Sequence, residues 1–160
     1  MTADPRDAAA IRVPPPLYPL LTILLGVGLQ RLWPLHGVPG GATPARYWVG
    51  GLIVAGAVLG LGLLPVVLFR RTGQSELPWT PTTSIVEQGP YRFTRNPMYL
   101  HMVLVCIGMA VLLWNAWILL LTPLCAWALH RFAIVREEAY LEGKFGEAYR
   151  DYMRRVRRWI

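Results

Sequence analysis

Three long apolar tracts divide this chain, and their lengths predict helices that cross a membrane. The tracts cover residues 17–35, 47–69 and 98–130, and Arg31 is the one charged residue within them. A helix that spans a bilayer needs about 20 apolar residues, so each of the first two tracts predicts a single span. The chain is therefore expected to be a helical membrane protein.

The third tract is too long for one crossing and too short for two straight crossings of full length. Near its middle, the tetrapeptide Trp114–Trp117 is typical of a tight turn at the membrane surface, where aromatic rings collect. We expect a hairpin of two spans over about 98–113 and 116–135, the second running past His130. The expected fold class is an all-α bundle of about four spans in one domain, residues 1–160. A three-span chain with one long tilted helix is the alternative.

The basic residues predict the orientation of this bundle. With four spans, all of them fall on one side of the membrane except Arg31 and Arg46. Because basic residues collect on the cytoplasmic side, both termini are expected in the cytoplasm and the protein in an inner (plasma) membrane. A three-span chain would divide the basic groups between the two faces, which counts against it.

Composition agrees with this class and narrows the partners. Hydrophobic residues make up 54% of the chain and charged residues 16%, below the roughly 25% of soluble domains. The net charge of +7 comes from residues beside the apolar tracts, so anionic membrane lipids are the expected partner, and no nucleic acid. Cys106 and Cys125 lie within spans and are expected to be free thiols, with a disulfide as the alternative. No zinc-binding spacing occurs, so no metal is expected.

Small residues in the second tract predict a packing contact. Gly56 and Gly60 are four residues apart, a spacing that lets two helices approach closely. We expect them to pack against another span of the same chain, with dimerisation as the alternative. Gly62 and Pro65 are expected to kink the helix. The oligomeric state stays open.

The segment Gly89–Tyr99 places prolines, tyrosines, Arg92 and Arg95 directly before the third tract. Irregular backbone near membrane depth is tolerated where protein or a water-filled cavity satisfies its polar groups, so the segment predicts a pocket at the membrane surface. Two simpler interpretations stand beside this one. The arginines follow the positive-inside rule, and Asn96-Pro97 starts a helix, since proline suits the first helical position.

The C-terminal third is charged and amphipathic. Apolar and aromatic residues recur at spacings of three and four, which predicts a cytosolic helix over about 136–154. We expect it to fold back beneath the polar segment, so that Glu137 and Glu138 face the same pocket as the arginines. The alternative is that the glutamates are juxtamembrane surface charges, whose ion pairs contribute little.

These motifs together resemble a known family. Arg95-Asn96-Pro97-Met98-Tyr99 before a hairpin, Glu137-Glu138 after it, and the pattern from Phe145 to Trp159 are similar to the isoprenylcysteine carboxyl methyltransferase-like and phospholipid methyltransferase superfamily. The resemblance covers roughly residues 73–159. Many members carry a glycine where this chain has His101.

The resemblance implies methyl transfer from S-adenosylmethionine at the cytosolic membrane face to a lipid-like or hydrophobic small-molecule acceptor, through a carboxyl, thiol or amine group. It implies a cofactor site formed by Arg95, Asn96, Pro97, Tyr99, Leu100, Glu137 and Glu138. The glutamates would meet the cationic part of the cofactor, and an arginine its carboxylate. Glu137 and Arg95 are the expected catalytic residues.

Two other functions remain open at this point. Membrane sterol reductases that use NADPH have a similar architecture. A non-catalytic membrane assembly protein would need none of these polar residues for ligand binding.

Overall fold

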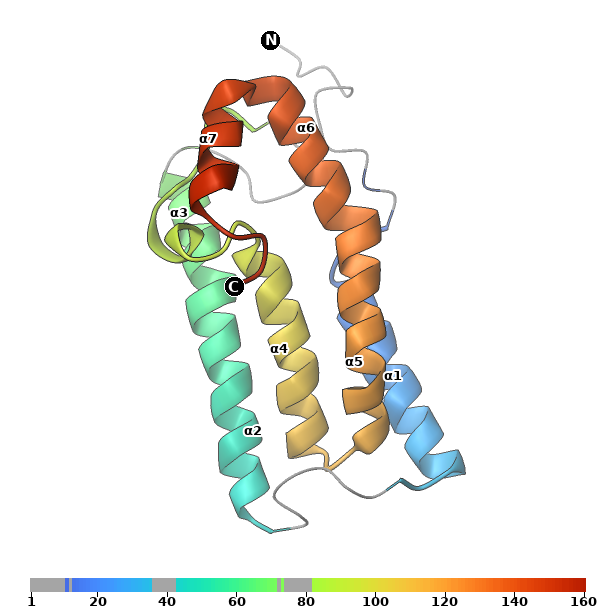
Figure 1. Cartoon of the computed structure of the whole chain (residues 1–160). Coiled ribbons are helices and arrows are strands. Elements are labelled where there is room, and N and C mark those ends of the chain that lie inside the picture. The colour runs from blue at the N-terminus through green and yellow to red at the C-terminus, as the bar shows by residue number, and fades with distance from the viewer. Residues whose placement is uncertain (1–10, 12, 36–42, 72, 74–81) are drawn as a thin grey trace.

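A computed structural model describes residues 11, 13–35, 43–71, 73 and 82–160 of the chain. Every regular element in these residues is helical, as Figure 1 shows, in agreement with the expected fold class. The elements in chain order are α1 (Leu17–Leu32), α2 (Ala45–Gly56), a π-helical segment (Ala57–Leu63), α3 (Leu64–Arg71), a 3₁₀ turn (Gly89–Arg92), α4 (Pro97–Leu112), α5 (Ala116–Leu129), a second π-helical segment (His130–Ile134), α6 (Val135–Phe145) and α7 (Glu147–Arg155).

Two continuous helices are long and apolar enough to cross a membrane. Ala45–Arg71 has 27 residues and Ala116–Phe145 has 30. The other two apolar helices, α1 and α4, have 16 residues each, which corresponds to about 24 Å at 1.5 Å per residue. Four spans in a bilayer core of about 30 Å therefore stay a prediction. Large apolar side chains cover the outer faces of the helices, as expected where lipid replaces water.

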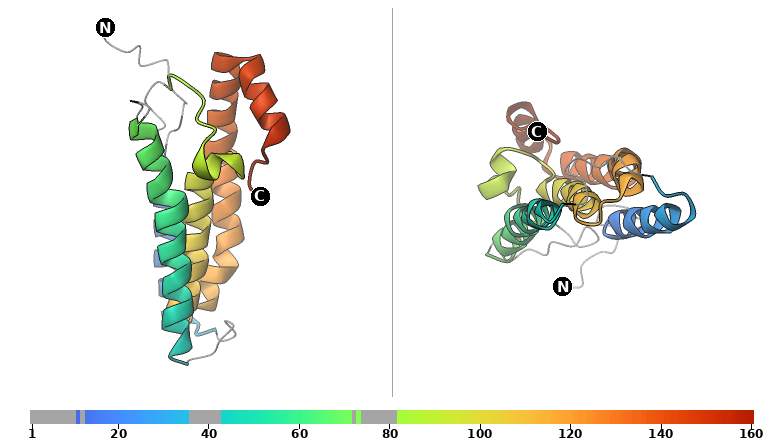
Figure 2. Two further views of the ribbon diagram at one scale, coloured as in Figure 1. Left: turned by 90° about the vertical axis from the view of Figure 1, so that its left-hand side faces the viewer. Right: turned by 90° about the horizontal axis from the view of Figure 1, so that it is seen from below.

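The four long helices lie side by side, with α4 at the centre of the group (Figure 2). Helix α4 packs against both α2 and α5, and α1 packs against α5. The core between α4 and α5 includes Cys106, Ala110, Ile118 and Leu129, all fully buried. Cys125 is also buried there, and both cysteines are free thiols, as the sequence predicts.

The hairpin between α4 and α5 turns where the sequence predicts it. Trp114 has a positive φ of 49°, and Asn115 follows as the N-cap of α5. The Asn115 side chain accepts a hydrogen bond from the Ile118 N–H at 3.1 Å, which satisfies one of the free amides at the helix start. Its Nδ2 donates to the Gly26 carbonyl at 3.1 Å, so the turn also holds α1 in place.

The expectation that Gly56 and Gly60 form the close helix contact is wrong. A Cβ at either position would meet nothing within 4 Å. The contact is made by Gly50 of α2 and Gly108 of α4, and buried Ala57 follows on the same face as Gly50. Successive helical residues lie about 100° apart, so Gly56 is turned well away from the face that Ala57 presents.

A Gly50→Ala variant is expected to destabilise the protein by roughly 1–3 kcal/mol, because the contact leaves no room for a methyl group. A Cβ at this position would lie 2.7 Å from the Leu112 nitrogen and 2.8 Å from the Gly108 oxygen, so backbone must move. Thermal unfolding in detergent measures the effect. Gly51→Ala is the matched control: its Cβ meets nothing within 4 Å, so it is expected to be neutral or stabilising.

The expected C-terminal helix over 136–154 differs from the structure. It is divided into α6 and α7 at Gly146, which has a φ of +55° that glycine adopts without a steric penalty. The reversal lets α7 fold back, so that the C-terminus lies beside the start of α4 (Figure 1). The Tyr152 hydroxyl donates to the Tyr91 carbonyl at 2.8 Å and ties α7 to the 3₁₀ turn. The sequence predicts a kink near Gly62. At this place the continuous helix formed by α2 and α3 contains the π-helical segment Ala57–Leu63.

Candidate functional site

The polar segment before α4 folds into a compact turn that is buried on one side. Pro90 and Tyr91 of the 3₁₀ turn are buried, and Asn96 is the N-cap of α4, with Pro97 as its first residue. The helix-start interpretation of Asn96-Pro97 is thus confirmed. Asn96 makes no side-chain capping bond, however. Its amide Nδ2 donates instead to the Arg158 carbonyl at 3.1 Å and to Glu138 Oε1 at 3.3 Å, which commits this side chain to the site.

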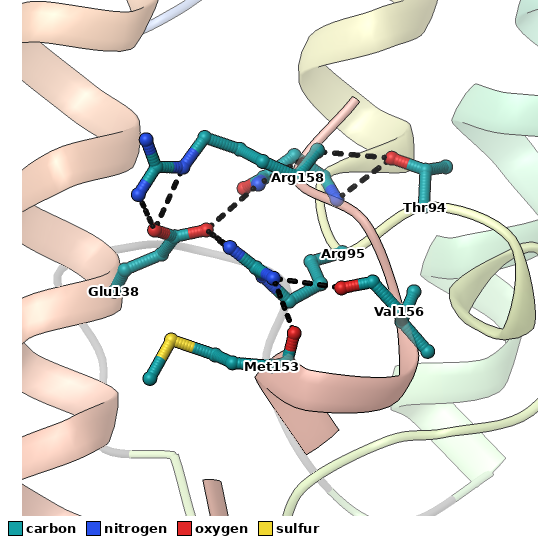
Figure 3. Close-up of polar contacts among 7 residues, drawn as sticks. Thr94, Arg95, Glu138, Met153, Val156 and Arg158 are labelled. Atoms are coloured by element: carbon teal, nitrogen blue, oxygen red, sulfur yellow. Dashed lines mark hydrogen bonds and ion pairs between the residues drawn. The ribbon is translucent and has the colours of Figure 1, made fainter. Parts of the chain in front are cut away.

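The C-terminal segment Val156–Arg158 lies along this turn. Thr94 and Arg157 form an isolated parallel bridge, in which the Arg95 N–H donates to the Arg157 carbonyl at 2.9 Å. The Thr94 hydroxyl donates to the Arg158 carbonyl at 3.2 Å (Figure 3). The last residues of the chain therefore hold the backbone of the motif in place.

An ion-pair cluster around a buried carboxylate joins the turn, α6 and the C-terminal segment (Figure 3). Arg158 lies at its edge, with a side chain that is 39% exposed. Arg95 donates through Nε and Nη2 to Glu138 Oε1 at 3.1 and 3.0 Å, and Arg158 donates through Nε and Nη2 to Oε2 at 2.9 and 2.6 Å. The Glu138 side chain is 7% exposed and that of Arg95 9%. Arg95 Nη1 also donates to the carbonyls of Met153 and Val156. Both oxygens of Glu138 are thus satisfied by protein groups.

Glu137, its neighbour on α6, has different surroundings. Its Oε2 accepts a hydrogen bond from the Tyr99 hydroxyl at 2.7 Å, and no other described residue bonds to its carboxylate. Burial raises the pKa of Glu137. The hydrogen bond from Tyr99 lowers this pKa in part, and the negative charge of Glu138 raises it further. Burial also disfavours charge on Glu138, but the hydrogen bonds and charges of Arg158 and Arg95 outweigh it and lower its pKa. Glu137 is therefore the carboxylate with a free oxygen.

A cavity of about 180 Å³ lies where these elements meet. The turn, α4, α6 and α7 form much of its wall, and the rest of the described lining comes from the segment 82–86, from residues before α1 and from the end of α3. Six aromatic side chains of the described residues line it: Phe69, Tyr91, Tyr99, Tyr140, Tyr149 and Tyr152. Burial raises the pKa of Tyr91, Tyr149 and Tyr152, so these hydroxyls stay neutral. The cavity offers aromatic faces, neutral hydroxyls and the carboxylate of Glu137.

The structure brings most of the expected site residues to this cavity. Its lining includes Arg95, Asn96, Pro97, Tyr99, Glu137 and Glu138. Leu100 does not line it. Neither does His101, whose ring lies against the second tract instead: a Cβ at Gly62 would be 3.4 Å from it. The histidine at this position, where the resemblance implies a glycine, therefore lies outside the cavity lining.

The geometry separates the roles that the sequence assigns jointly to the two glutamates. Glu138 pairs with Arg95, the residue expected to meet the carboxylate of a ligand. Four of the five N–H donors of Arg95 already bond to Glu138, Met153 and Val156, so a bidentate bond to such a carboxylate would require the release of one of them. The two arginines and Glu138 form one support, and Glu137 faces the cavity beside it.

Several residues of the site are not among those that the sequence singles out as ligand-binding. These are Tyr91, Thr94, Tyr149, Tyr152 and Arg158. A signal exists for all five. Tyr91 and Thr94 lie in the segment Gly89–Tyr99 that predicts the pocket. Tyr149 and Tyr152 belong to the apolar stripe of the C-terminal third, and Arg158 to the motif that ends at Trp159. Their approach to the turn depends on the chain reversal at Gly146, which spacing along a straight helix does not reveal.

Comparisons with known proteins place this geometry in context. Residues 46–148 match the model of the phospholipid methyltransferase family. The chain is 40% identical over 63 residues to an uncharacterized protein of Haemophilus influenzae, a match that covers 39% of this chain and all of that protein. It is 35% identical over 72 residues to the protein-S-isoprenylcysteine O-methyltransferase of Schizosaccharomyces pombe, covering 45% of this chain and 30% of that protein. No solved structure matches the chain.

Proposed function

Because the chain belongs to the phospholipid methyltransferase family, we propose that it transfers a methyl group from S-adenosylmethionine to a hydrophobic or lipid-like acceptor at the cytosolic face of a membrane. The observation that carries this proposal is the free carboxylate oxygen of Glu137 in a cavity walled by tyrosines. The cavity adjoins helices that are long and apolar enough to cross a bilayer. A lipid-like acceptor has the shortest route to such a place.

The residues around the cavity fit the cationic part of the cofactor. S-adenosylmethionine supplies a methyl group activated by a sulfonium. Glu137 would hold the positively charged part, because a charge-assisted bond to a carboxylate is stronger than one between neutral groups. The faces of Tyr91 and Tyr149 suit a cation or an aromatic base. Asn96 and Pro97 would form the neighbouring wall, as the sequence predicts.

For methyl transfer, the protein has to hold the acceptor in position and keep water away from the reacting atoms. The acceptor atom has to approach in line, about 3–3.5 Å from the methyl carbon, and this reaction needs no protein nucleophile. The Tyr99 hydroxyl fixes the Glu137 carboxylate from one side, so its free oxygen points to a defined place. The side chains of Pro97, Met98 and Met102 give the cavity an apolar wall, which would limit the access of water to a bound acceptor. If the acceptor is an anion, loss of that water makes it more reactive.

We propose an apolar acceptor and leave its reacting group open. A carboxyl, a thiol and an amine all accept a methyl group without a change in the site described above. The name of the Schizosaccharomyces pombe relative points to an oxygen acceptor on an isoprenylcysteine, and that match covers 30% of the relative. Four spans, with both termini in the cytoplasm, would place the cavity at the cytosolic surface, where the arginines concentrate.

S-adenosylhomocysteine, the product of the cofactor, is expected to raise the melting temperature of the detergent-solubilised protein. At a concentration of 100 times its dissociation constant, a ligand that binds only the folded state stabilises it by about 2.7 kcal/mol. For a chain of this size, that corresponds to a shift of roughly 5–11 °C.

NADPH at the same concentration is the comparison ligand. A shift with NADPH and none with S-adenosylhomocysteine would favour a reductase, and no shift with either would favour a non-catalytic membrane protein. Either result would exclude the methyltransferase proposal.

A further inference from the structure

Arg158 connects the end of the chain to the candidate site through both its side chain and its main chain. Its guanidinium donates to Glu138 Oε2 at 2.9 and 2.6 Å. Its carbonyl accepts bonds from the Thr94 hydroxyl and from the Asn96 amide at 3.2 and 3.1 Å. One residue therefore fastens α6 to the motif turn at three points.

The neighbouring arginines have different surroundings. Arg154 and Arg155 are well exposed, and they pair on the surface with Asp151 and Glu87. The side chain of Arg157 is exposed as well, although its backbone takes part in the bridge to Thr94. A general attraction to lipid headgroups accounts for such surface arginines. It does not account for two hydrogen bonds from Arg158 to a carboxylate that is 7% exposed.

The ion pair between Arg158 and Glu138 also affects the charge on Glu137. Arg95 occupies one oxygen of Glu138, and Arg158 the other. Without Arg158, Oε2 would be left unpaired close to a second carboxylate, and each negative charge would disfavour the other. The Glu138 carboxylate, which already lines the cavity, would also lose the bonds that hold it to Arg158 and would be free to meet the ligand beside Glu137.

We propose that Arg158 is a positioning residue of the methyl-transfer site, which holds Glu138 against Arg95 and Asn96 and so keeps Glu137 as the single carboxylate that meets the ligand. This inference rests on the proposed function. Arg158 acts through Glu138, and it does not line the cavity itself.

The ionisation of Glu137 gives the proposal a measurable signature. Charged and titratable groups face the two glutamates from every element around them: Tyr91, Arg95, Tyr99, Tyr149, Tyr152 and Arg158. Burial keeps Tyr91, Tyr149 and Tyr152 neutral in the neutral pH range, so Arg95 and Arg158 are the charges among these groups that offset the glutamates. Without Arg158, Glu137 is expected to lose its proton at a higher pH. The rise of ligand binding with pH is expected to move to higher pH as well.

The test is calorimetric binding of S-adenosylhomocysteine to the full chain in detergent, measured across the neutral pH range. Arg158→Gln is expected to weaken binding at neutral pH about tenfold or more, because it removes hydrogen bonds to a charged group, and to move the rise of binding to higher pH. Arg157→Gln, the adjacent control, is expected to stay within about twofold of the wild type. Arg158→Lys keeps the charge, so it is expected to restore the pH profile but only part of the affinity.

A double variant separates positioning from general stability. In a Glu138→Gln background, Arg158→Gln is expected to have less than about a third of its effect on binding, because the two act as one unit. Equal effects of Arg157→Gln and Arg158→Gln, or an unchanged pH profile in Arg158→Gln, would overturn the inference while leaving the proposed function intact. A wild-type protein that does not bind S-adenosylhomocysteine would overturn both. If Arg158→Gln does not fold, the pH profile of ligand binding to Arg158→Lys is the deciding measurement. A shift of that profile to higher pH, as expected for the glutamine variant, would contradict a role for the charge.

Discussion

A Glu137→Gln variant is expected to bind S-adenosylhomocysteine about 10- to 100-fold more weakly than the wild type and to lose methyl transfer at least in proportion, because a hydrogen bond to a charged group contributes about 1.5–3 kcal/mol. Glutamine keeps an oxygen that can accept the bond from Tyr99, so the fold around α6 has no reason to change. The variant therefore isolates the charge of the carboxylate that, among the described residues lining the cavity, has an oxygen without a protein partner. Calorimetry on the purified protein measures the loss.

The pH dependence of the same variant checks the assignment. The pKa of Glu137 is raised in the folded protein, so wild-type binding of a cationic group is expected to increase as the pH rises through that value. Binding to Glu137→Gln is expected to lack this increase.

The stability of the folded protein is expected to change with pH in the opposite direction. A carboxyl group with a raised pKa binds its proton more tightly in the folded state, so its contribution to stability falls as the pH rises above its ordinary value. The glutamine variant avoids this loss and is expected to melt no lower than the wild type at neutral pH.

Glu142→Gln is the matched control for Glu137→Gln, because Glu142 lies on the same helix and its side chain is 45% exposed in a pair with Arg150. Its effects on binding and stability are expected to be small, since exposed ion pairs contribute at most about 1 kcal/mol. If Glu137→Gln and Glu142→Gln bound the ligand equally well, Glu137 would not be the ligand-binding carboxylate.

A Glu138→Ala variant is expected to lose stability rather than binding alone, by about 3–5 kcal/mol, because it leaves a buried guanidinium without its partner. Arg95 is 9% exposed, and its Nε and Nη2 both donate to Glu138. Without that carboxylate, Arg95 and Arg158 would be like charges on opposite sides of an empty space. For a chain of this size the loss corresponds to a fall in melting temperature of roughly 6–20 °C.

Acid unfolding gives an independent measure of the same cluster. The folded-state pKa of Glu138 is lowered, so its contribution to stability is complete above the ordinary carboxyl value and is lost as the pH falls through the lower, folded value. The alanine variant is expected to lack this part of the acid dependence. Glu147→Ala, which removes an exposed partner of Arg150, is the control and is expected to change stability by no more than about 1 kcal/mol. Equal melting temperatures for the two variants would show that the cluster is not a structural support.

The helices and the location of the site could be predicted from the sequence because both depend on local pattern. Apolar tracts of membrane length specify the helices, and Trp114–Trp117 marks the hairpin turn. The hairpin then returns the chain to the face from which it started, so Glu137 has to come near Asn96 whatever the side-chain packing. This is why most of the expected site residues line one cavity.

The partners of each side chain depend on packing between distant segments. The sequence predicts a close contact at Gly56 and Gly60, whereas Gly50 and Gly108 make it, because the rotation of α2 about its axis is set by the face that meets α4. The sequence likewise presents Glu137 and Glu138 as a pair. Neighbouring helical positions point about 100° apart, so one turns to Tyr99 and the cavity and the other to the arginines.

By itself, then, the sequence of this protein determined an all-helical membrane chain whose Asn96-Pro97 motif and glutamates meet at one end, because hydrophobic length and chain direction leave little choice. Only the tertiary structure decided that Glu138 supports the site, that Glu137 faces the cavity, and that Arg158 belongs to it. The reason is the reversal at Gly146, a single backbone conformation that brings the last residues of the chain against the motif turn.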